Sequence, residues 1–215
     1  MNVHIPDHPL ISDALARCRD ARTGTIAFRR AMTELGRYLA YECCRDWLPL
    51  LSGEVLTPLG VRAPATRVDE RQCVEIVPIL RAGLALIEGV LPLMPDARIL
   101  HVGYRRDEET AKAVCYLTGL PERLSPDTRF LILEPMLATG GTLVQVFDAM
   151  QSRGANMKLV RVVSLIASQP GLEKITSQHP EPGIWCAAID SQLDERAYIV
   201  PGLGDAGDRA FGTGL

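Results

Sequence analysis

The segment 131–142 carries the residue types best suited to chemistry. It contains an apolar run, then the acidic Glu134, then the glycine pair Gly140 and Gly141. Two adjacent glycines let the backbone fold closely around a ligand, and the N–H groups at the start of a following helix attract anions, so a phosphate fits there. A side chain at Gly140 is expected to occupy the space of that phosphate. Since the segment lacks the GxxxxGK pattern of nucleoside triphosphatases, it predicts a phosphate monoester.

Glu134 indicates what the rest of the ligand is. A carboxylate that faced the phosphate would repel it, but a carboxylate accepts hydrogen bonds from neutral sugar hydroxyls. The hydroxyl groups of Thr139 and Thr142 add donors beside the glycines. A sugar phosphate satisfies both features of the segment.

Arginines follow two other apolar runs. Arg81 follows residues 74–80, and Arg105 and Arg106 follow residues 98–103. Ligands of an open parallel sheet bind where strands pass into their following loops, so these arginines and the glycine segment are expected to meet at one edge. The alternative for each arginine alone is a solvated strand end, and Arg105 is expected to turn to solvent.

Short apolar strands that alternate with helices must position these loops. This alternation predicts an α/β fold with an open parallel sheet of about five strands, flanked by helices on both faces. The strands are expected at residues 74–80, 98–103, 130–133, 158–165 and 184–189, and the helices between them at residues 82–94, 141–150 and 171–178.

The N-terminal part predicts a further helix, with Thr25 as its N-cap. Apolar residues recur there on one helical face, at Phe28, Met32, Leu35 and Leu39. This face is expected to pack in the core or against another subunit. A single domain has little else to cover it, so the chain is expected to form at least a homodimer.

Length and composition limit the remaining classes. The 215 residues predict one domain over residues 1–215. The 23 Lys and Arg against 26 Asp and Glu give a net charge of −3, so neither nucleic acid nor a membrane is an expected partner. The six cysteines and four histidines lack metal-site spacing, so no protein metal site is expected. The first residues show no basic region that leads into an apolar run, so no signal peptide and a reducing cytoplasm are expected.

The run 134–142 resembles the phosphoribosyl pyrophosphate (PRPP) loop of the uracil phosphoribosyltransferase family, whose pattern is D-P-M-[LV]-A-T-G. The segments 77–83, 106–110 and 198–208 resemble the remaining signatures, in the family's order. Weaker matches at 8–10, 41–42 and 211–213 extend the resemblance over nearly the whole chain. The sequence departs from the family at Glu134, where Asp is usual, and at Arg105, where Tyr is common.

The resemblance implies a type I phosphoribosyltransferase fold in which residues 190–215 form a C-terminal hood over the base. The implied reaction joins uracil to the phosphoribosyl group of PRPP, giving uridine monophosphate (UMP) and diphosphate. Mg²⁺ is the implied cofactor, and Arg81, Arg106 and Asp205 are the implied catalytic residues. The same three residues are expected to bind PRPP together with Glu134, Pro135, Met136, Leu137, Ala138, Thr139, Gly140, Gly141 and Thr142. Uracil is expected at Ile199, Gly204, Asp205 and Ala206.

Physical chemistry supports the choice of uracil over other bases. Uracil presents an acceptor, a donor and an acceptor along one edge, which main-chain groups of an extended loop can match. Cytosine reverses two of these polarities, and each buried mismatch costs about 1–3 kcal/mol. The alternative for Asp205 is an Asx-type turn in a glycine-rich loop.

Two alternative functions remain open from the sequence. One is a PRPP- or nucleotide-sensing, RNA-binding regulator of pyrimidine genes, which would need a basic face that the net acidic composition disfavours. The other is a transferase for purine bases. The segment 199–206 disfavours it, because by resemblance this loop is built to hold a single pyrimidine ring.

Overall fold

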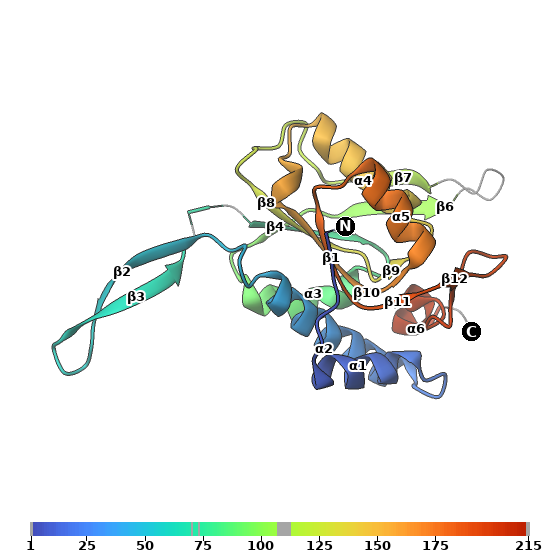
Figure 1. The fold of residues 1–215 in the computed structure, drawn as a ribbon, viewed down its shortest axis with the longest axis horizontal. Helices are drawn as coiled ribbons and strands as arrows, with labels where there is room; N and C mark the ends of the chain where they lie inside the picture. The colour runs from blue at the N-terminus through green and yellow to red at the C-terminus, as the bar shows by residue number, and fades with distance from the viewer. Residues whose placement is uncertain (1, 70, 73, 107–112, 214–215) are drawn as a thin grey trace.

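The computed structural model describes residues 2–69, 71–72, 74–106 and 113–213, apart from the side chain of Arg106. A nine-stranded sheet forms its centre (Figure 1), with the strand order β1-β11-β10-β8-β4-β6-β7, while β5 pairs with β4 and β9 with β10. Every pairing in this sheet is parallel except that of β6 with β7. The strands are β1 Val3–His4, β4 Val74–Leu80, β5 Arg98–Ile99, β6 Val102–Arg106, β7 Ala113–Thr118, β8 Arg129–Leu133, β9 Met136–Leu137, β10 Val160–Ser168 and β11 Gly183–Asp190.

Helices cover both faces of the sheet (Figure 1). The face that carries α2 also carries α1 and α3, and the opposite face carries α4 and α5. The short α6 packs against α2 near the C-terminus. The helices are α1 Pro9–Arg19, α2 Thr25–Cys43, α3 Leu84–Val90, α4 Gly141–Ser152, α5 Gln169–Gln178 and α6 Ala206–Phe211, with 3₁₀ turns η1 Leu91–Leu93 and η2 Met157–Leu159.

The strand β8 illustrates how the apolar runs build two cores. Successive side chains of a strand point to opposite faces of the sheet. Leu131 and Leu133 accordingly pack in the core under α2, while Phe130 and Ile132 pack in the core under α4. A strand buried on both faces needs a continuous apolar sequence, which is what residues 130–133 provide.

The predicted α/β fold with a parallel sheet between helices is confirmed, with some differences in its elements. The expected strand 98–103 is divided into β5 and β6. The expected helix 82–94 is α3 followed by η1, where Pro92 lacks the N–H group that a continuing helix needs. The N-cap of α2 is Gly24 rather than Thr25, and no side chain caps it.

Three antiparallel hairpins were not predicted. The strand β7 returns along β6, and β12 Gln192–Leu193 pairs with β13 Ile199–Val200. The third hairpin is an arm formed by β2 Leu50–Leu56 and β3 Arg62–Val68, which projects away from the rest of the molecule (Figure 1).

The prediction that the apolar face of the N-terminal helix needs a second subunit to cover it is wrong. Phe28, Met32, Leu35 and Leu39 are completely buried within the chain, in the core that α2 shares with α3, β10 and β11. That apolar face therefore needs no second subunit to cover it.

Among the described residues, none of the helices has the length and apolar character needed to cross a membrane. The assignment of residues 1–215 to one domain, with 190–215 as its hood, stays a prediction.

Candidate active site

The carboxyl ends of β4, β6 and β8 meet at one pocket of about 200 Å³, which we call the central pocket. Arg81 follows β4, Glu134 follows β8, and Tyr104 is the middle residue of β6. Thr142 from α4 and Asp205 from the C-terminal segment complete its polar lining. The structure thus brings together residues that the sequence placed on separate loops.

A second pocket, of about 370 Å³, adjoins the glycine turn and is called here the loop pocket. Gly140 is the N-cap of α4 and has a left-handed backbone with φ of 71°, which favours glycine. Thr139, Gly141 and Thr142 line the pocket, so the start of a 12-residue helix faces it. Arg105 is exposed, as expected, but it also lines this pocket.

The expectation that a side chain at Gly140 would occupy the space of the phosphate is wrong. A Cβ atom at Gly140 would lie 2.7 Å from the carbonyl oxygen of Gly171 and 2.9 Å from Cγ1 of Ile175, both in α5. It would therefore point into the packing of α5 rather than into the loop pocket. A Cβ at Gly141 would instead lie 3.6 Å from both the Thr139 hydroxyl and Lys174 Nζ, which line the loop pocket.

Glu134 lies at the end of β8, where its backbone N–H donates to the Val163 carbonyl at 3.1 Å. Burial raises the pKa of Glu134 to about 8, and a hydrogen bond from the Met136 backbone opposes this shift. Glu134 is therefore mainly protonated in the free protein at pH 7. Burial and the nearby Cys115 also raise the pKa of Tyr104, to about 12, so its hydroxyl stays neutral.

Arg81 joins the end of β4 to the C-terminal segment. Its Nη2 lies 3.0 Å from Asp208 Oδ1, and its Nη1 donates to the Thr213 hydroxyl at 3.2 Å. The Thr213 hydroxyl in turn donates to Asp208 at 2.7 Å, and these contacts hold the pKa of Asp208 below its usual range. The peptide bond between Leu80 and Arg81 is cis.

Asp205 has a structural contact as well as a place in the site. Its side chain caps α6 by accepting a hydrogen bond from the Asp208 backbone at 2.8 Å, as in the Asx-type alternative. The residue also lines the central pocket and a third pocket beside it.

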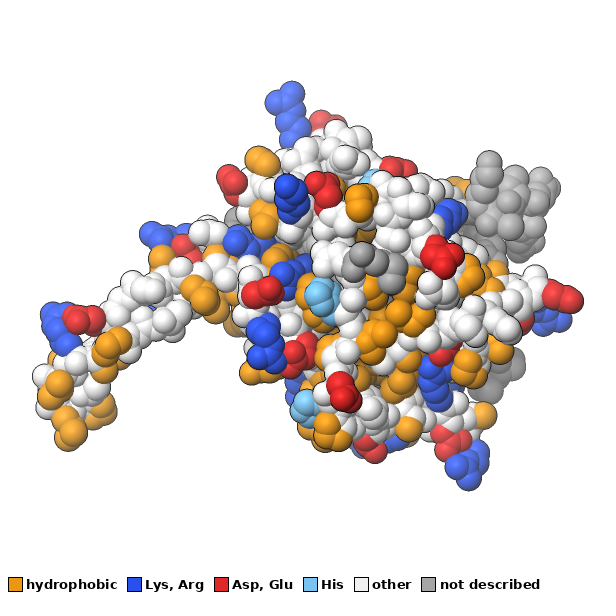
Figure 2. Space-filling view, viewed as in Figure 1, with side chains coloured by type: hydrophobic (Ala, Val, Ile, Leu, Met, Phe, Trp, Pro, Cys, Tyr) orange, Lys and Arg blue, Asp and Glu red, His pale blue; other side chains and the backbone are white. Residues whose placement is uncertain are grey.

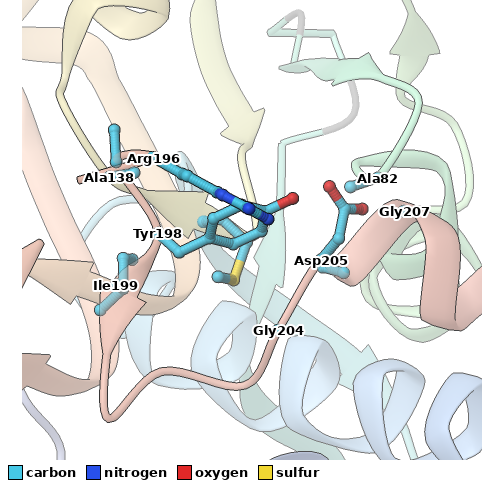
Figure 3. A pocket seen from close by; sticks show the side chains of 11 residues that line it. Ala82, Ala138, Arg196, Tyr198, Ile199, Gly204, Asp205 and Gly207 are labelled. Carbon is cyan, nitrogen blue, oxygen red and sulfur yellow. The ribbon is translucent and has the colours of Figure 1, made fainter. Parts of the chain in front are cut away.

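The third pocket, the base pocket, has a volume of about 380 Å³. Its lining includes Ile199, Gly204, Asp205 and Ala206, the four residues predicted to hold uracil. Met136 and Ala138 of the predicted PRPP loop line it too, together with Ala82, Arg196, Ala197, Tyr198 and Gly207. In Figure 3 the side chains of Arg196 and Tyr198 extend into this pocket opposite the Asp205 carboxylate.

The remaining predicted site residues either line none of the three pockets or have no described side chain. Pro135 and Leu137 line none of these three pockets, and both contact β10 instead: the Pro135 carbonyl accepts from the Leu165 backbone at 2.9 Å, and Leu137 pairs with Ala167. Their contact with PRPP stays a prediction. Arg106 ends β6, but its side chain and residues 107–112 lie outside the described residues, so the segment 106–110 stays a prediction as well.

Sequence reasoning missed Arg196, Tyr198 and Lys174 as lining residues. Arg196 and Tyr198 could have been predicted from the sequence, because Tyr198 is the first residue of the family-like segment 198–208 and Arg196 lies two residues before it. Lys174 carries no local signal, since only the packing of α5 brings it to the loop pocket.

Comparison with known proteins agrees with this geometry. The family model described as uracil phosphoribosyltransferase matches residues 5–213. The uracil phosphoribosyltransferase of Synechococcus elongatus is 50% identical over 213 residues, which cover 99% of this chain and 98% of that protein. The solved structure of the AQ2163 protein from Aquifex aeolicus has a TM-score of 0.88 and 36% identity, with 98% of each chain covered.

A more distant structure, the APRTase from Giardia lamblia, has a TM-score of 0.52 and 16% identity and covers 84% of this chain and 85% of its own. It shares the fold alone, which is the type I phosphoribosyltransferase fold expected from the motifs. The family match over residues 5–213 and the 50% identity to a full-length relative decide the assignment. This chain belongs to the uracil phosphoribosyltransferase family.

Proposed function

We propose that the protein transfers the phosphoribosyl group of PRPP to uracil and releases UMP and diphosphate. The observation that carries this proposal is that the three pockets form a continuous row. The base and central pockets share Ala82, Asp205 and Gly207, and the central and loop pockets share Tyr104 and Thr142. Base, ribose and 5′-phosphate follow one another in the same order along UMP.

The loop pocket suits the 5′-phosphate. The start of α4 supplies outward N–H groups and a positive dipole end, and Thr139 and Thr142 supply hydroxyls. Neutral ribose hydroxyls would then meet Glu134 in the central pocket. A protonated carboxyl both donates and accepts hydrogen bonds, and an ionised one accepts only, so Glu134 can serve a sugar in either state.

The reaction breaks the bond between C1 of the ribose and the diphosphate oxygen and forms a bond from C1 to N1 of uracil. The proton of N1 passes to the released diphosphate or to water. Positive charge develops on the ribose ring and negative charge on the leaving diphosphate. Arg81 and Arg106 are proposed to stabilise the leaving group, with Asp205 beside the ribose. Arg81 contacts Asp208 and Thr213 in the free chain, so diphosphate would replace or share these partners.

Mg²⁺ fits a site of this kind when the substrate supplies most of its ligands. Within the described residues there is no group of three His, Cys, Asp or Glu side chains that could hold a metal by itself. Two carboxyl groups, Asp205 and Glu134, do line the central pocket, and Glu134 would serve as a ligand only in its ionised form. Mg²⁺ is commonly held by one or two carboxylates plus phosphate oxygens and water, and it would add positive charge beside the leaving diphosphate.

The base pocket suits uracil through its main chain. Gly204 and Ala206 line the pocket on either side of Asp205, and Ile199 supplies an apolar wall. Hydrogen bonds from such groups to the uracil edge would discriminate against cytosine, since each mismatched buried group costs about 1–3 kcal/mol.

Self-association is proposed at the arm formed by β2 and β3 rather than at α2. Leu56 is 72% exposed and Leu59 is 89% exposed, and Val61 lies beside them at the tip. Figure 2 shows hydrophobic side chains gathered at the end of the arm, away from the body of the molecule. A second copy of the chain that buried this tip would form the expected homodimer or a larger homo-oligomer.

A cytoplasmic location is proposed from the cysteines. The five cysteines that the structure describes are all free thiols, as expected in a reducing compartment.

The test is to incubate the purified protein with PRPP, Mg²⁺ and one base at a time, using uracil, cytosine, adenine, guanine and hypoxanthine. Chromatography identifies the nucleotide, and a coupled assay measures diphosphate. We expect equal amounts of UMP and diphosphate with uracil and no nucleotide with the other bases. Formation of a purine nucleotide, or no product from uracil, would overturn the proposal.

A further inference from the structure

Helix α5 is fixed against the turn that precedes α4. The Ser168 hydroxyl, at the N-cap of α5, donates to the Ala138 carbonyl at 2.5 Å and accepts from the Gly171 backbone at 2.9 Å. The Gly171 carbonyl and the Ile175 side chain lie on the far side of Gly140. The first two turns of α5 therefore have a defined position relative to the turn 138–141.

This packing carries Lys174 to the loop pocket. Residues 171, 174, 175 and 178 recur at helical spacing on one side of α5. Gly171 and Ile175 contact Gly140, and Lys174 and Gln178 line the loop pocket. Lys174 Nζ lies 3.6 Å from the position that a Gly141 Cβ would take, so the ammonium group stands beside the first residue of α4.

The charge of Lys174 is not neutralised by neighbouring acids. Among the described residues, no carboxylate lies within ion-pair distance of Lys174. The preceding residue on the helix, Glu173, accepts a hydrogen bond from Gln169 at 2.9 Å, and Asp148 of α4 contacts His179 at 2.9 Å. Arg105 is a second cation on the lining of the same pocket.

We infer that Lys174 binds the 5′-phosphate of PRPP and of UMP, as a binding residue that the motifs of the family resemblance do not include. The inference rests on the proposed function, because it takes the loop pocket as the phosphate site. The backbone N–H groups at the start of α4 and the threonine hydroxyls would donate to the phosphate from one side. The ammonium group of Lys174 would contact it from α5. A lysine serves as a mobile point charge with three donors, which suits a phosphate with three free oxygens.

The chemistry predicts which constants Lys174 affects. The 5′-phosphate keeps its charge and its bonds throughout the reaction, so a contact to it stabilises substrate and transition state equally. Loss of that contact raises KM for PRPP and leaves kcat nearly unchanged. The affinity for UMP falls, while the affinities for uridine and for inorganic diphosphate stay the same, since neither carries the 5′-phosphate.

Calorimetric titration of the free protein with UMP, uridine and inorganic diphosphate tests the inference without measuring activity. We expect Lys174→Ala to weaken UMP binding about tenfold, the effect of one exposed charge-assisted hydrogen bond, and to leave uridine binding unchanged. Lys174→Arg keeps the charge and is expected to retain most of the affinity. The matched control is Lys158→Ala, which removes the same charge from η2, outside the three pockets.

The outcomes separate this inference from the proposed function. If the parent binds UMP and Lys174→Ala binds it equally well, the role of Lys174 is refuted and the proposed function stands. The same holds if Lys174→Ala loses affinity for UMP and for uridine to the same extent. A fall of equal size in Lys158→Ala would also refute it, since the effect would then be one of net charge. If the parent binds UMP no more tightly than uridine, the loop pocket is not a phosphate site and both proposals fail.

Discussion

Replacement of Gly140 by alanine is expected to destabilise the protein, although the residue lies in the predicted phosphate turn. Gly140 has a φ of 71°, and alanine in this left-handed region costs about 1–2 kcal/mol relative to its ordinary conformation. The added methyl would also lie 2.7 Å from the Gly171 carbonyl oxygen, which belongs to the backbone and cannot turn away as a side chain does.

The size of the effect follows from these two contributions. Overpacking of a tightly packed contact typically costs about 1–3 kcal/mol. Ser168 bonds to Ala138 and so keeps α5 from moving freely away from the turn. Together with the backbone cost, we expect Gly140→Ala to lower the free energy of unfolding by about 2–5 kcal/mol.

Gly141→Ala is the matched comparison. Its methyl would make ordinary contacts at 3.6 Å, and its backbone lies in a helix where alanine is preferred to glycine. Urea unfolding followed by circular dichroism should therefore give Gly141→Ala a midpoint at or above that of the parent, but weaker UMP binding because the methyl lies beside the loop pocket. Equal midpoints for Gly140→Ala and the parent would refute the packing argument.

Three other predictions concern separate parts of the molecule. Arg81→Ala should weaken binding of inorganic diphosphate at least tenfold and lower kcat/KM for PRPP more than Arg105→Ala does, and steady-state kinetics that reverse this ranking would contradict the assignment. Because burial raises the pKa of Glu134 from 4.5 to about 8, its stabilising contribution is complete below about pH 4.5 and is lost as the pH rises through about 8. Urea unfolding should therefore show Glu134→Gln gaining stability over the parent, by an amount on the order of a few kcal/mol, between pH 5 and pH 9, and a pH-independent difference would refute the buried carboxyl. Charged residues in place of Leu56 and Leu59 should shift the protein to monomers in light scattering, and an unchanged mass would exclude the arm tip as the contact.

The sequence predicted the sheet and the position of the site because local patterns determine both. Continuous apolar runs such as 130–133 identify strands buried on two faces, and the residues that follow them must lie at one edge of a parallel sheet. Arg81, Glu134 and Thr142 therefore met in one pocket as expected.

Local sequence patterns could not predict the hairpin arm or which part of the chain covers the apolar face of α2. The residues of β2 and β3 pair only with each other and are largely exposed, so their sequence lacks the apolar alternation of a half-buried strand. An apolar helical face, in contrast, gives no sign of what covers it. The face of α2 is covered by β10 and β11, more than a hundred residues further along the chain.

The direction of side chains in the site also depends on the packing of elements that are distant in sequence. The sequence indicated that Gly140 needs to be glycine, but the reason is the carbonyl of Gly171 and the side chain of Ile175. Lys174 reaches the loop pocket for the same reason, because α5 packs on the turn before α4. No pattern within residues 169–178 could have indicated either contact.

A crystal structure of the protein with bound UMP tests the central claim most directly. We predict uracil in the base pocket between Ile199 and Ala206, ribose hydroxyls within hydrogen-bond distance of Glu134, and the 5′-phosphate at the turn 139–142 with Lys174 Nζ beside it. UMP bound with its phosphate near Arg81, or outside the row of three pockets, would contradict the proposed division of the site.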